Sequence, residues 1–345
     1  MSRPLRAGIV GYGLAGRSFH SLLLKGAGFE VSAITTKNVD RIVQAQKDFP
    51  EATICDSFEK MLDTNLDLVV IASTNVVHAE QAIASIQAGI TVVVDKPMAL
   101  DVAQTQSIID HSVAKGVGAS VFFNRKWDSD ALTIQKIIRE GILGNIFRLE
   151  SRFERFRPNV NEQSWREQTS PELGGGNLLD LQPHLISTSL DWFGPASLAF
   201  SSVRSVRKVS DDDVVLVLKH ESGIDSYLSA SAISGAPGPR IRLIGDKGAL
   251  VINELDPQEN LLRAGKYPKS DVWKEDTRSR SFLHQGDLVT EYPSEPGNYA
   301  AYYAQIRHAI IEQAPPESSL WPTSHSEALA VARIIEAARK VSIRE

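Results

Sequence analysis

The sequence is poor in cysteine, lacks long apolar runs and has no excess of basic charge. Cys55 is the only cysteine among 345 residues, so no intrachain disulfide is possible. This usage suits a reducing compartment, and with no signal-peptide pattern near residue 1 we expect a cytoplasmic protein. The apolar runs are too short to cross a bilayer, so we expect no membrane contact. A formal net charge of −5 gives no reason to expect nucleic-acid binding.

Two frequent kinds of catalytic site are also missing from the sequence. The eight histidines show no HxH, HxxH or HExxH spacing, so we expect no metal site. No GxSxG elbow is present, which argues against a serine hydrolase.

What is present is an alternation of apolar runs and helical patterns up to residue 123. It predicts an α/β fold with a doubly wound parallel sheet, a Rossmann dinucleotide-binding domain over residues 1–123. Strand patterns then follow one another, which predicts a substrate-binding α+β domain over 124–345 with an open, largely antiparallel sheet. Helical patterns at 299–313 and 326–341 are expected to pack back on the first domain, and 257–280 reads as an exposed irregular stretch.

A glycine-rich loop follows the first apolar run. Gly11, Gly13 and Gly16 have the GxGxxG spacing that lets backbone amides approach a dinucleotide pyrophosphate, with Leu14 and Ala15 between them. Glycines also mark ordinary tight turns. Because a strand pattern precedes this loop and a helix pattern follows it, dinucleotide binding is the favoured interpretation.

The residue that selects between NAD and NADP lies about 20 residues further on, where an acidic side chain would hydrogen-bond the adenosine ribose 2′-hydroxyl of NAD. Thr36 and Lys37 stand there instead, and neither is acidic. Lys37 with Arg41 can pair a 2′-phosphate, so we expect NADP, with NAD as the alternative. The competing interpretation of Lys37 is a solvated loop residue.

Lys96 ends a buried strand pattern, between Asp95 and Pro97. Proline has no N–H and stops the ladder at a defined point, which places the lysine at the carboxyl edge of the sheet. An ammonium there can hold an alkoxide or pass a proton. Thr74 and Asn75 follow a neighbouring strand pattern; they either cap the next helix or face a nicotinamide.

A third motif follows a triple glycine at 174–176. Asp180 and His184 are four residues apart, so one helix would place them on the same face. An aspartate one turn before a histidine can orient the imidazole as a general base. The alternative is a helix cap and a packed core histidine.

Together these motifs resemble the glucose–fructose oxidoreductase/inositol dehydrogenase (Gfo/Idh/MocA) family over nearly the whole chain. The resemblance lies in GYGLAG (11–16), STNVVH (73–78), VVVDKPMA (92–99), FFNRKWDSD (122–130), WRE (165–167), GGGNLLDLQPH (174–184) and GNYAAYY (297–303). It implies a Rossmann domain followed by an α/β domain whose open sheet often forms a dimer face, so we expect a homo-oligomer.

The resemblance also implies roles for particular residues. Lys96 corresponds to the catalytic lysine, His184 to the acid/base and Asp180 to its partner. The cofactor would be lined by Ser73, Thr74, Asn75, His78, Asp95, Asn124, Trp165 and Arg166. Asp95 replaces the family's glutamate, and Ser187 stands where many members carry an acid, which puts the orientation of His184 in doubt.

The favoured function is an NADP-preferring dehydrogenase or reductase that moves a hydride between nicotinamide and a secondary alcohol or ketone of a sugar, inositol or related polyol. The rival is a non-catalytic NAD(P)-binding sensor or scaffold. Retention of Lys96, Asp180 and His184 favours the enzyme, because a non-catalytic protein needs none of the three.

Overall fold

The computed structural model describes residues 3–162, 164–268, 273 and 278–342. The chain divides into two compact units, and each is discontinuous in sequence. The first unit comprises residues 1–122, 258–273 and 298–329, and the second comprises 123–257, 274–297 and 330–345. No helix among the described residues is long and apolar enough to cross a membrane.

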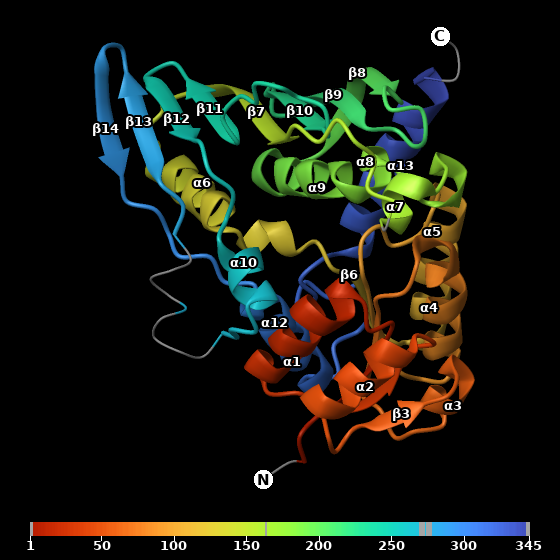
Figure 1. Ribbon diagram of the computed structural model, residues 1–345. Coiled ribbons are helices and arrows are strands. Elements are labelled where there is room, and N and C mark those ends of the chain that lie inside the picture. Colours follow the sequence, from red (N-terminus) through yellow and green to blue (C-terminus); the bar gives the residue numbers. More distant parts are fainter. Residues whose placement is uncertain (1–2, 163, 269–272, 274–277, 343–345) are drawn as a thin grey trace. The chain divides into compact units, whose positions relative to one another are not determined.

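A six-stranded parallel sheet forms the centre of the first unit (Figure 1). Its order is β3-β2-β1-β4-β5-β6, which confirms the doubly wound sheet predicted from the sequence. The strands are nearly continuous apolar runs because both faces of the sheet are covered by helices. They are β1 (Arg6–Val10), β2 (Glu30–Thr35), β3 (Thr53–Cys55), β4 (Leu68–Ile71), β5 (Thr91–Val94) and β6 (Ala119–Val121).

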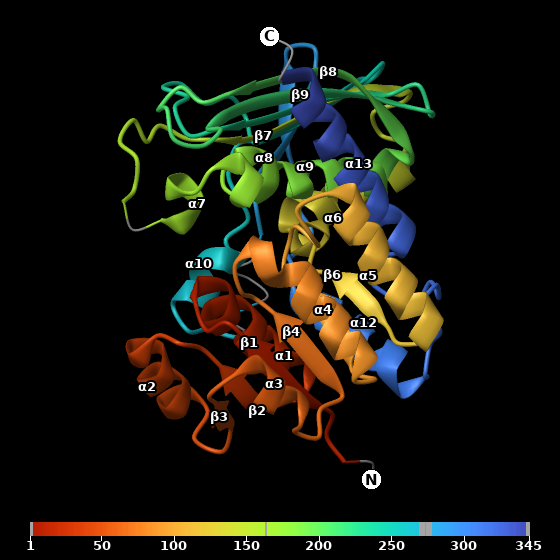
Figure 2. The ribbon, with the colours of Figure 1, turned by 90° about the vertical axis from the view of Figure 1, so that its right-hand side faces the viewer.

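Helices of this unit lie on both faces of its sheet. Helix α4 packs beside α5 on one face, and α1 packs beside α12 on the other (Figures 1 and 2). Their bounds are α1 (Ser21–Ala27), α2 (Val39–Asp48), α3 (Phe58–Leu62), α4 (His78–Gln87), α5 (Val102–Lys115), α10 (Gln258–Arg263) and α12 (Ala300–Ile311), with short turns η1 (Ala15–His20) and η2 (Asn75–Val77).

One expectation for this part of the chain is wrong. Residues 257–280 were expected to be irregular, yet 258–263 form α10, in which Gln258 and Leu262 are buried. The Gln258 side chain accepts a hydrogen bond from the Tyr299 amide, 2.8 Å away, and so ties this helix to the start of α12. Residues 269–272 and 274–277 lie outside the described part.

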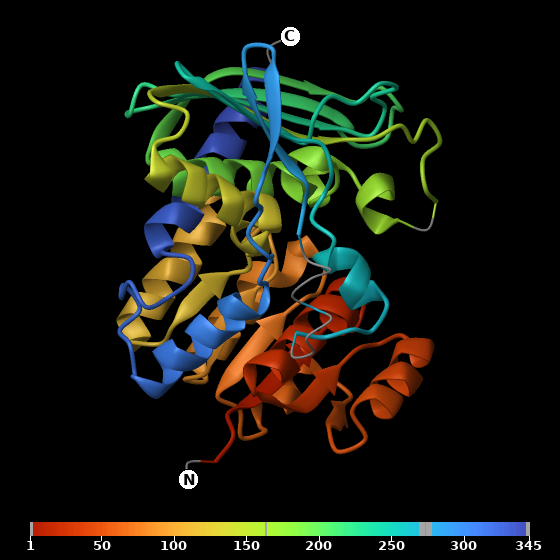
Figure 3. The ribbon, with the colours of Figure 1, turned by 90° about the vertical axis from the view of Figure 1, so that its left-hand side faces the viewer.

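An eight-stranded, mostly antiparallel sheet forms the second unit, as the sequence predicted. Its order is β14-β13-β12-β11-β7-β10-β9-β8, and only β7 and β10 pair in parallel. The hairpin of β13 and β14, which is prominent in Figure 3, is absent from the sequence-based prediction. The strands are β7 (Ile146–Glu154), β8 (Ala196–Arg204), β9 (Asp213–His220), β10 (Asp225–Ser231), β11 (Ile241–Gly245), β12 (Gly248–Ile252), β13 (Ser281–Gln285) and β14 (Leu288–Tyr292).

Helices of the second unit lie against one face of this sheet, where Leu149 and Phe153 of β7 are buried (Figure 1). The opposite face of β7 carries charge: Glu150 pairs with Arg152 and with Arg242 of β11. The helical segments are η3 (Asn124–Trp127), α6 (Ser129–Glu140), α7 (Trp165–Gln168), η4 (Pro171–Leu173), α8 (Asn177–Asp180) and α9 (Gln182–Phe193). The division between units falls within α13 (His325–Ser342).

Candidate active site

The glycine loop between β1 and η1 needs its first and last glycine for steric reasons. Gly11 has a φ of +90°, and a Cβ there would lie 2.5 Å from the carbonyl oxygen of Ala72. A Cβ on Gly16 would lie 2.0 Å from the carbonyl oxygen of Gly11. Only glycine therefore lets the chain turn this tightly from β1 into the following helical turn. Leu14, at the tip of the loop, is exposed.

Helix α2 brings a cation to this loop. Asn38 caps the helix, its side-chain oxygen accepting the Arg41 amide at 3.1 Å. The space at Gly13 faces the Arg41 guanidinium, because a Cβ on Gly13 would lie 3.5 Å from Arg41 Nη1. Lys37, at the end of β2, is exposed like Arg41. The two cations proposed for a 2′-phosphate thus lie at the same end of the sheet.

Asp48 fixes the far end of α2 to the same loop. Its Oδ2 accepts bonds from Tyr12 Oη at 3.0 Å and from Arg17 Nε at 2.7 Å. Burial alone would raise the pKa of Asp48, but these bonds outweigh it and the pKa is lowered. Both donors belong to the glycine-loop region, so the loop and α2 form one connected piece.

Lys96 follows β5 and is buried together with Asp95. The Lys96 amide donates to Asp95 Oδ1 at 2.9 Å, and the Lys96–Pro97 peptide bond is cis. As the sequence predicted, the lysine follows the carboxyl end of a parallel strand; whether it acts in catalysis stays a prediction. Strands β4, β5 and β1 end at this same edge of the sheet.

His78, at the start of α4, connects two strand ends. Its Nδ1 lies 2.9 Å from the Pro97 carbonyl oxygen and its Nε2 lies 3.3 Å from that of Ser73. The ring is fully buried, so it fixes the segment after β5 against the segment after β4. Thr74 occupies the N-cap of η2 without a side-chain capping bond, so helix capping does not explain that residue. Asn75 is buried.

In the second unit, Arg166 and Asp180 form an ion pair, with 3.1 Å between Arg166 Nε and Asp180 Oδ1. The Arg166 guanidinium also lies over the Trp165 ring, 4.7 Å from its centroid. Both members of the ion pair are partly exposed. Two motifs that are separate in the sequence, the one with Trp165 and Arg166 and the one with Asp180, are thus brought together.

His184 is buried in α9, but the expected arrangement with Asp180 is wrong in one respect. Helix α8 ends at Asp180 and α9 begins at Gln182, so the two residues do not share one continuous helix. The Ser187 hydroxyl donates to the backbone carbonyl of His184 at 3.2 Å. Ser187 therefore donates to the main chain of His184, whereas an acid at this position in the family would orient the imidazole.

An aromatic–cation cluster lies beside His184 and is absent from the sequence-based prediction. The Phe153 ring lies 6.4 Å from the imidazole, edge to face. Two arginines flank the same phenylalanine: Arg240 at 4.0 Å and Arg125 at 5.5 Å from the ring centroid. Arg125 lies one residue after Asn124, within a motif already noted, whereas no sequence signal marks Arg240. Asn124 is buried at the start of η3.

Each unit brings together its own group of candidate residues. In the first unit, the glycine loop, Arg41, Lys96 and His78 lie at one edge of the sheet. In the second unit, Arg166, Asp180 and His184 lie in or near α8 and α9. That the two groups serve one reaction stays a prediction. Among the described residues, no group of three or more His, Cys, Asp or Glu is placed to hold a metal ion.

The parallel sheet with its glycine loop and the mixed, mostly antiparallel sheet define a two-domain α/β protein of the dinucleotide-binding class, and family models match both parts. The NAD-binding Rossmann fold of the oxidoreductase family matches residues 5–123, and the C-terminal alpha/beta domain of that family matches residues 135–343. The chain therefore belongs to the Gfo/Idh/MocA oxidoreductase family, which confirms the resemblance seen in the sequence.

Individual relatives match along the whole chain. YdgJ of Escherichia coli, an uncharacterised oxidoreductase, is 34% identical, covering 97% of this chain and 96% of its own. The NADP(+)-dependent scyllo-inositol 2-dehydrogenase IolW of Bacillus subtilis is 33% identical, covering 98% of this chain and 94% of its own. A structure of yvaA from Bacillus subtilis superposes with a TM-score of 0.87 at 31% identity, covering 99% of this chain and 96% of that one.

Proposed function

We propose that this protein is an NADP-preferring dehydrogenase or reductase acting on a secondary alcohol or ketone of a sugar, inositol or related polyol. The observation that carries the proposal is the position of Lys96: a buried lysine directly after a strand of the dinucleotide sheet, at the edge where that sheet's glycine loop lies. Ligands of open α/β sheets bind at the carboxyl ends of the strands. The similarity to IolW favours a cyclitol or sugar.

The residues at the glycine loop fit a dinucleotide. Gly13 lacks the Cβ that would lie beside the Arg41 guanidinium, and the amides of a loop that leads into a helical turn suit an approaching pyrophosphate. At the end of β2, Thr36 and Lys37 present no carboxylate to a ribose 2′-hydroxyl. Lys37 and Arg41 would bind a 2′-phosphate, which is the reason for preferring NADP.

Three side chains are proposed to act on the substrate. A nicotinamide dinucleotide held at the glycine loop would supply the hydride acceptor or donor for the substrate carbon. The Lys96 ammonium donates a hydrogen bond to the substrate oxygen and stabilises negative charge on it. His184 takes the hydroxyl proton in oxidation and returns it in reduction. Asp180 binds a substrate hydroxyl, and its ion pair with Arg166 holds the carboxylate in place.

The remaining cofactor contacts are proposed from the family motifs. Arg166 and Trp165 would lie against the nicotinamide end, together with Asn124 and the segment Ser73–Asn75. His78 and Asp95 support that segment and Lys96 through their buried hydrogen bonds. In this proposal His78 acts through the backbone that it fixes rather than by touching the cofactor.

We further propose a cytoplasmic homo-oligomer that forms through the second-unit sheet. The face of β7 that carries Glu150 and Arg152 is not the face against which α9 packs. Symmetric dimers are the commonest way of burying such a face. Light scattering at micromolar concentration tests this: a mass near twice 37.8 kDa is expected for a dimer, and a monomer would overturn the proposal.

The function is tested by turnover with both nucleotides. Oxidation of scyllo-inositol with NADP+ and reduction of a panel of keto-sugars with NADPH are followed at the nicotinamide absorbance. NADPH binding is measured separately by its fluorescence. Turnover of at least one compound is expected; tight NADPH binding without any turnover would favour the rival function, a sensor or scaffold that uses the cofactor structurally.

A further inference from the structure

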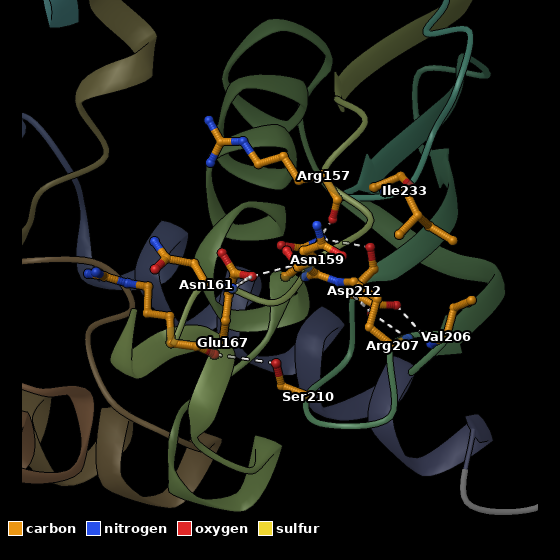
Figure 4. Close-up of polar contacts among 12 residues, drawn as sticks. Arg157, Asn159, Asn161, Glu167, Val206, Arg207, Ser210, Asp212 and Ile233 are labelled. Carbon is orange, nitrogen blue, oxygen red and sulfur yellow. Dashed lines mark hydrogen bonds and ion pairs between the residues drawn. The ribbon is translucent and has the colours of Figure 1, made fainter. Parts of the chain in front are cut away.

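The loop between β8 and β9, residues 205–212, is anchored by one arginine (Figure 4). Arg207 Nη1 donates to Glu167 Oε2 at 2.8 Å and to the carbonyl oxygens of Arg157 and Asn159 at 3.1 and 3.3 Å. Arg207 Nε donates to Asp212 Oδ2 at 3.0 Å. The Arg207 side chain is only 9% exposed, so this is a largely buried junction of one guanidinium with two carboxylates rather than a surface ion pair.

This junction holds the segment that carries the two candidate cofactor residues. Glu167 directly follows Trp165 and Arg166, and its Oε2 accepts both Arg207 and the Asn161 amide. Ser210 of the same loop donates to the Arg166 carbonyl oxygen at 3.3 Å. The β8–β9 loop therefore holds the Arg166 carbonyl oxygen directly and the side chain of the next residue, Glu167, through Arg207.

The same loop also holds the start of the helix that ends in Asp180. Asp211 Oδ1 accepts the Leu178 amide at 2.6 Å, and the Asp211 carbonyl oxygen accepts the Asn177 amide at 2.9 Å. Gly176 permits this approach, because a Cβ there would lie 2.0 Å from Asp211 Oδ2. The Gly176 amide in turn donates to the Arg166 carbonyl oxygen at 3.0 Å.

The loop backbone is itself unusual. Lys208 has a φ of +65°, in the left-handed region that non-glycine residues rarely adopt. Such conformations persist where the surrounding structure over-determines them, and they concentrate at functional sites. Here the surrounding bonds are those of Arg207, Ser210, Asp211 and Asp212.

We propose that Arg207 is a positioning residue that sets the Arg166–Asp180 ion pair by holding both of its main-chain supports on one loop. The inference rests on the proposed function in so far as that ion pair serves catalysis. Arg207 is distant in sequence from both residues and carries none of the family motifs, so its role follows from the tertiary contacts alone. The planar guanidinium of Arg207 contacts Glu167 through Nη1 and Asp212 through Nε at the same time, a geometry that a lysine ammonium reproduces only in part.

The test compares Arg207→Gln with Arg204→Gln in the full chain. Arg204 is a matched control: it ends β8 beside the same loop and pairs with Asp213, but its side chain is 62% exposed. We expect Arg207→Gln to lower kcat about ten-fold or more while NADPH affinity stays within about three-fold, because the dinucleotide is proposed to bind mainly through the first unit. Arg207→Lys should recover part of kcat, and Arg204→Gln should leave kcat within about two-fold of wild type.

A second measurement needs no turnover. Hydrogen exchange of peptides covering 164–169 and 176–181 should become faster in both segments in Arg207→Gln and in neither in Arg204→Gln. If Arg207→Gln fails to fold, Glu167→Ala breaks the junction from its other side and should change exchange and kcat in the same direction.

The outcomes separate the two proposals. Unchanged exchange in both segments, or faster exchange with wild-type kcat, would overturn the positioning role while the function stands. Wild-type protein that binds NADPH but turns over no compound would overturn the function, and the exchange data would still decide whether Arg207 holds the two segments together.

Discussion

The two units of this protein place their candidate residues by different means. In the first, Lys96 and the segment Ser73–Asn75 directly follow strands β5 and β4, so the parallel sheet itself delivers them to one edge. In the second, Arg166 and Asp180 come from separate short helices that are held by a loop 33 to 40 residues away in sequence. The comparison shows that a regular sheet positions functional groups through local sequence, whereas an irregular site depends on long-range contacts.

The largest effect is expected in the first unit, at Lys96. Lys96→Ala should lower turnover on the order of 10²-fold or more and leave NADPH affinity close to wild type, because only a positioned hydrogen-bond donor is lost. The control is Lys115→Ala, an exposed lysine at the end of α5. Steady-state kinetics measure the turnover, and a fluorescence titration with NADPH measures the affinity. Near-normal turnover in Lys96→Ala would show that position at a sheet edge does not imply function here.

A pair of glycine variants tests whether the second site depends on long-range packing. Gly176 and Gly223 have φ values of +88° and +85°, but only Gly176 has another residue in its Cβ position, Asp211 Oδ2 at 2.0 Å. Alanine at a positive φ costs about 1–2 kcal/mol at Gly223. At Gly176 the backbone (φ +88°, ψ 166°) lies in a region that essentially only glycine populates, which costs about 1–3 kcal/mol, and the clash adds about 1–3 kcal/mol more. Thermal unfolding should therefore show a clearly lower midpoint for Gly176→Ala than for Gly223→Ala. Equal midpoints would mean that the loop yields easily.

A third change tests the cofactor end of the first unit. Thr36→Asp should invert the nucleotide preference, because a carboxylate repels a 2′-phosphate and offers an acceptor to a ribose hydroxyl. We expect a change of about ten- to hundred-fold in the ratio of kcat/KM for NADP to that for NAD, less at high salt.

The matched lysine pair is Lys37→Ala, which should weaken NADP binding, and Lys47→Ala in the last turn of α2, which should not. An NAD-preferring wild type would show that Lys37 is only a solvated loop residue.

The smallest effect is the pH dependence of stability that Asp211, in the loop between β8 and β9, is expected to cause. Burial raises the pKa of Asp211 to about 6, above its ordinary value. Folded protein therefore holds a proton between about pH 4 and 6 that unfolded protein releases, and stability falls as pH rises through that window. One proton corresponds to at most ~1.4 kcal/mol per pH unit. Urea unfolding from pH 4 to 7 should show this slope, and Asp211→Asn should remove it.

Asp246 provides a control of opposite sign. Hydrogen bonds from the Asn145 side chain and amide lower the pKa of Asp246, so its contribution to stability is lost as pH falls through the folded value. Asp246→Asn should therefore leave the slope between pH 4 and 6 intact. If the free energy of unfolding of the wild type instead rose with pH throughout that window, the assignment to Asp211 would be contradicted.

Several features could be predicted from the sequence because their causes are local. Apolar runs that alternate with helical patterns predicted the doubly wound parallel sheet, and the glycine spacing at 11, 13 and 16 matches what the backbone requires sterically at Gly11 and Gly16. The family could be recognised because its motifs lie at strand and helix ends. Helix α10 and the β13–β14 hairpin were missed, since polar stretches such as 258–263 gain their structure from packing, as Gln258 does against Tyr299.

The sequence by itself determined the doubly wound sheet, the position of Lys96 after β5 and the family, because chain periodicity and turn residues act over a few neighbours. Tertiary structure alone decided the Arg166–Asp180 ion pair and the junction at Arg207. A buried charge is stable only where groups of opposite charge lie beside it. The carboxylates that pair with Arg207, those of Glu167 and Asp212, come from two segments that the fold, not the local sequence, brings together.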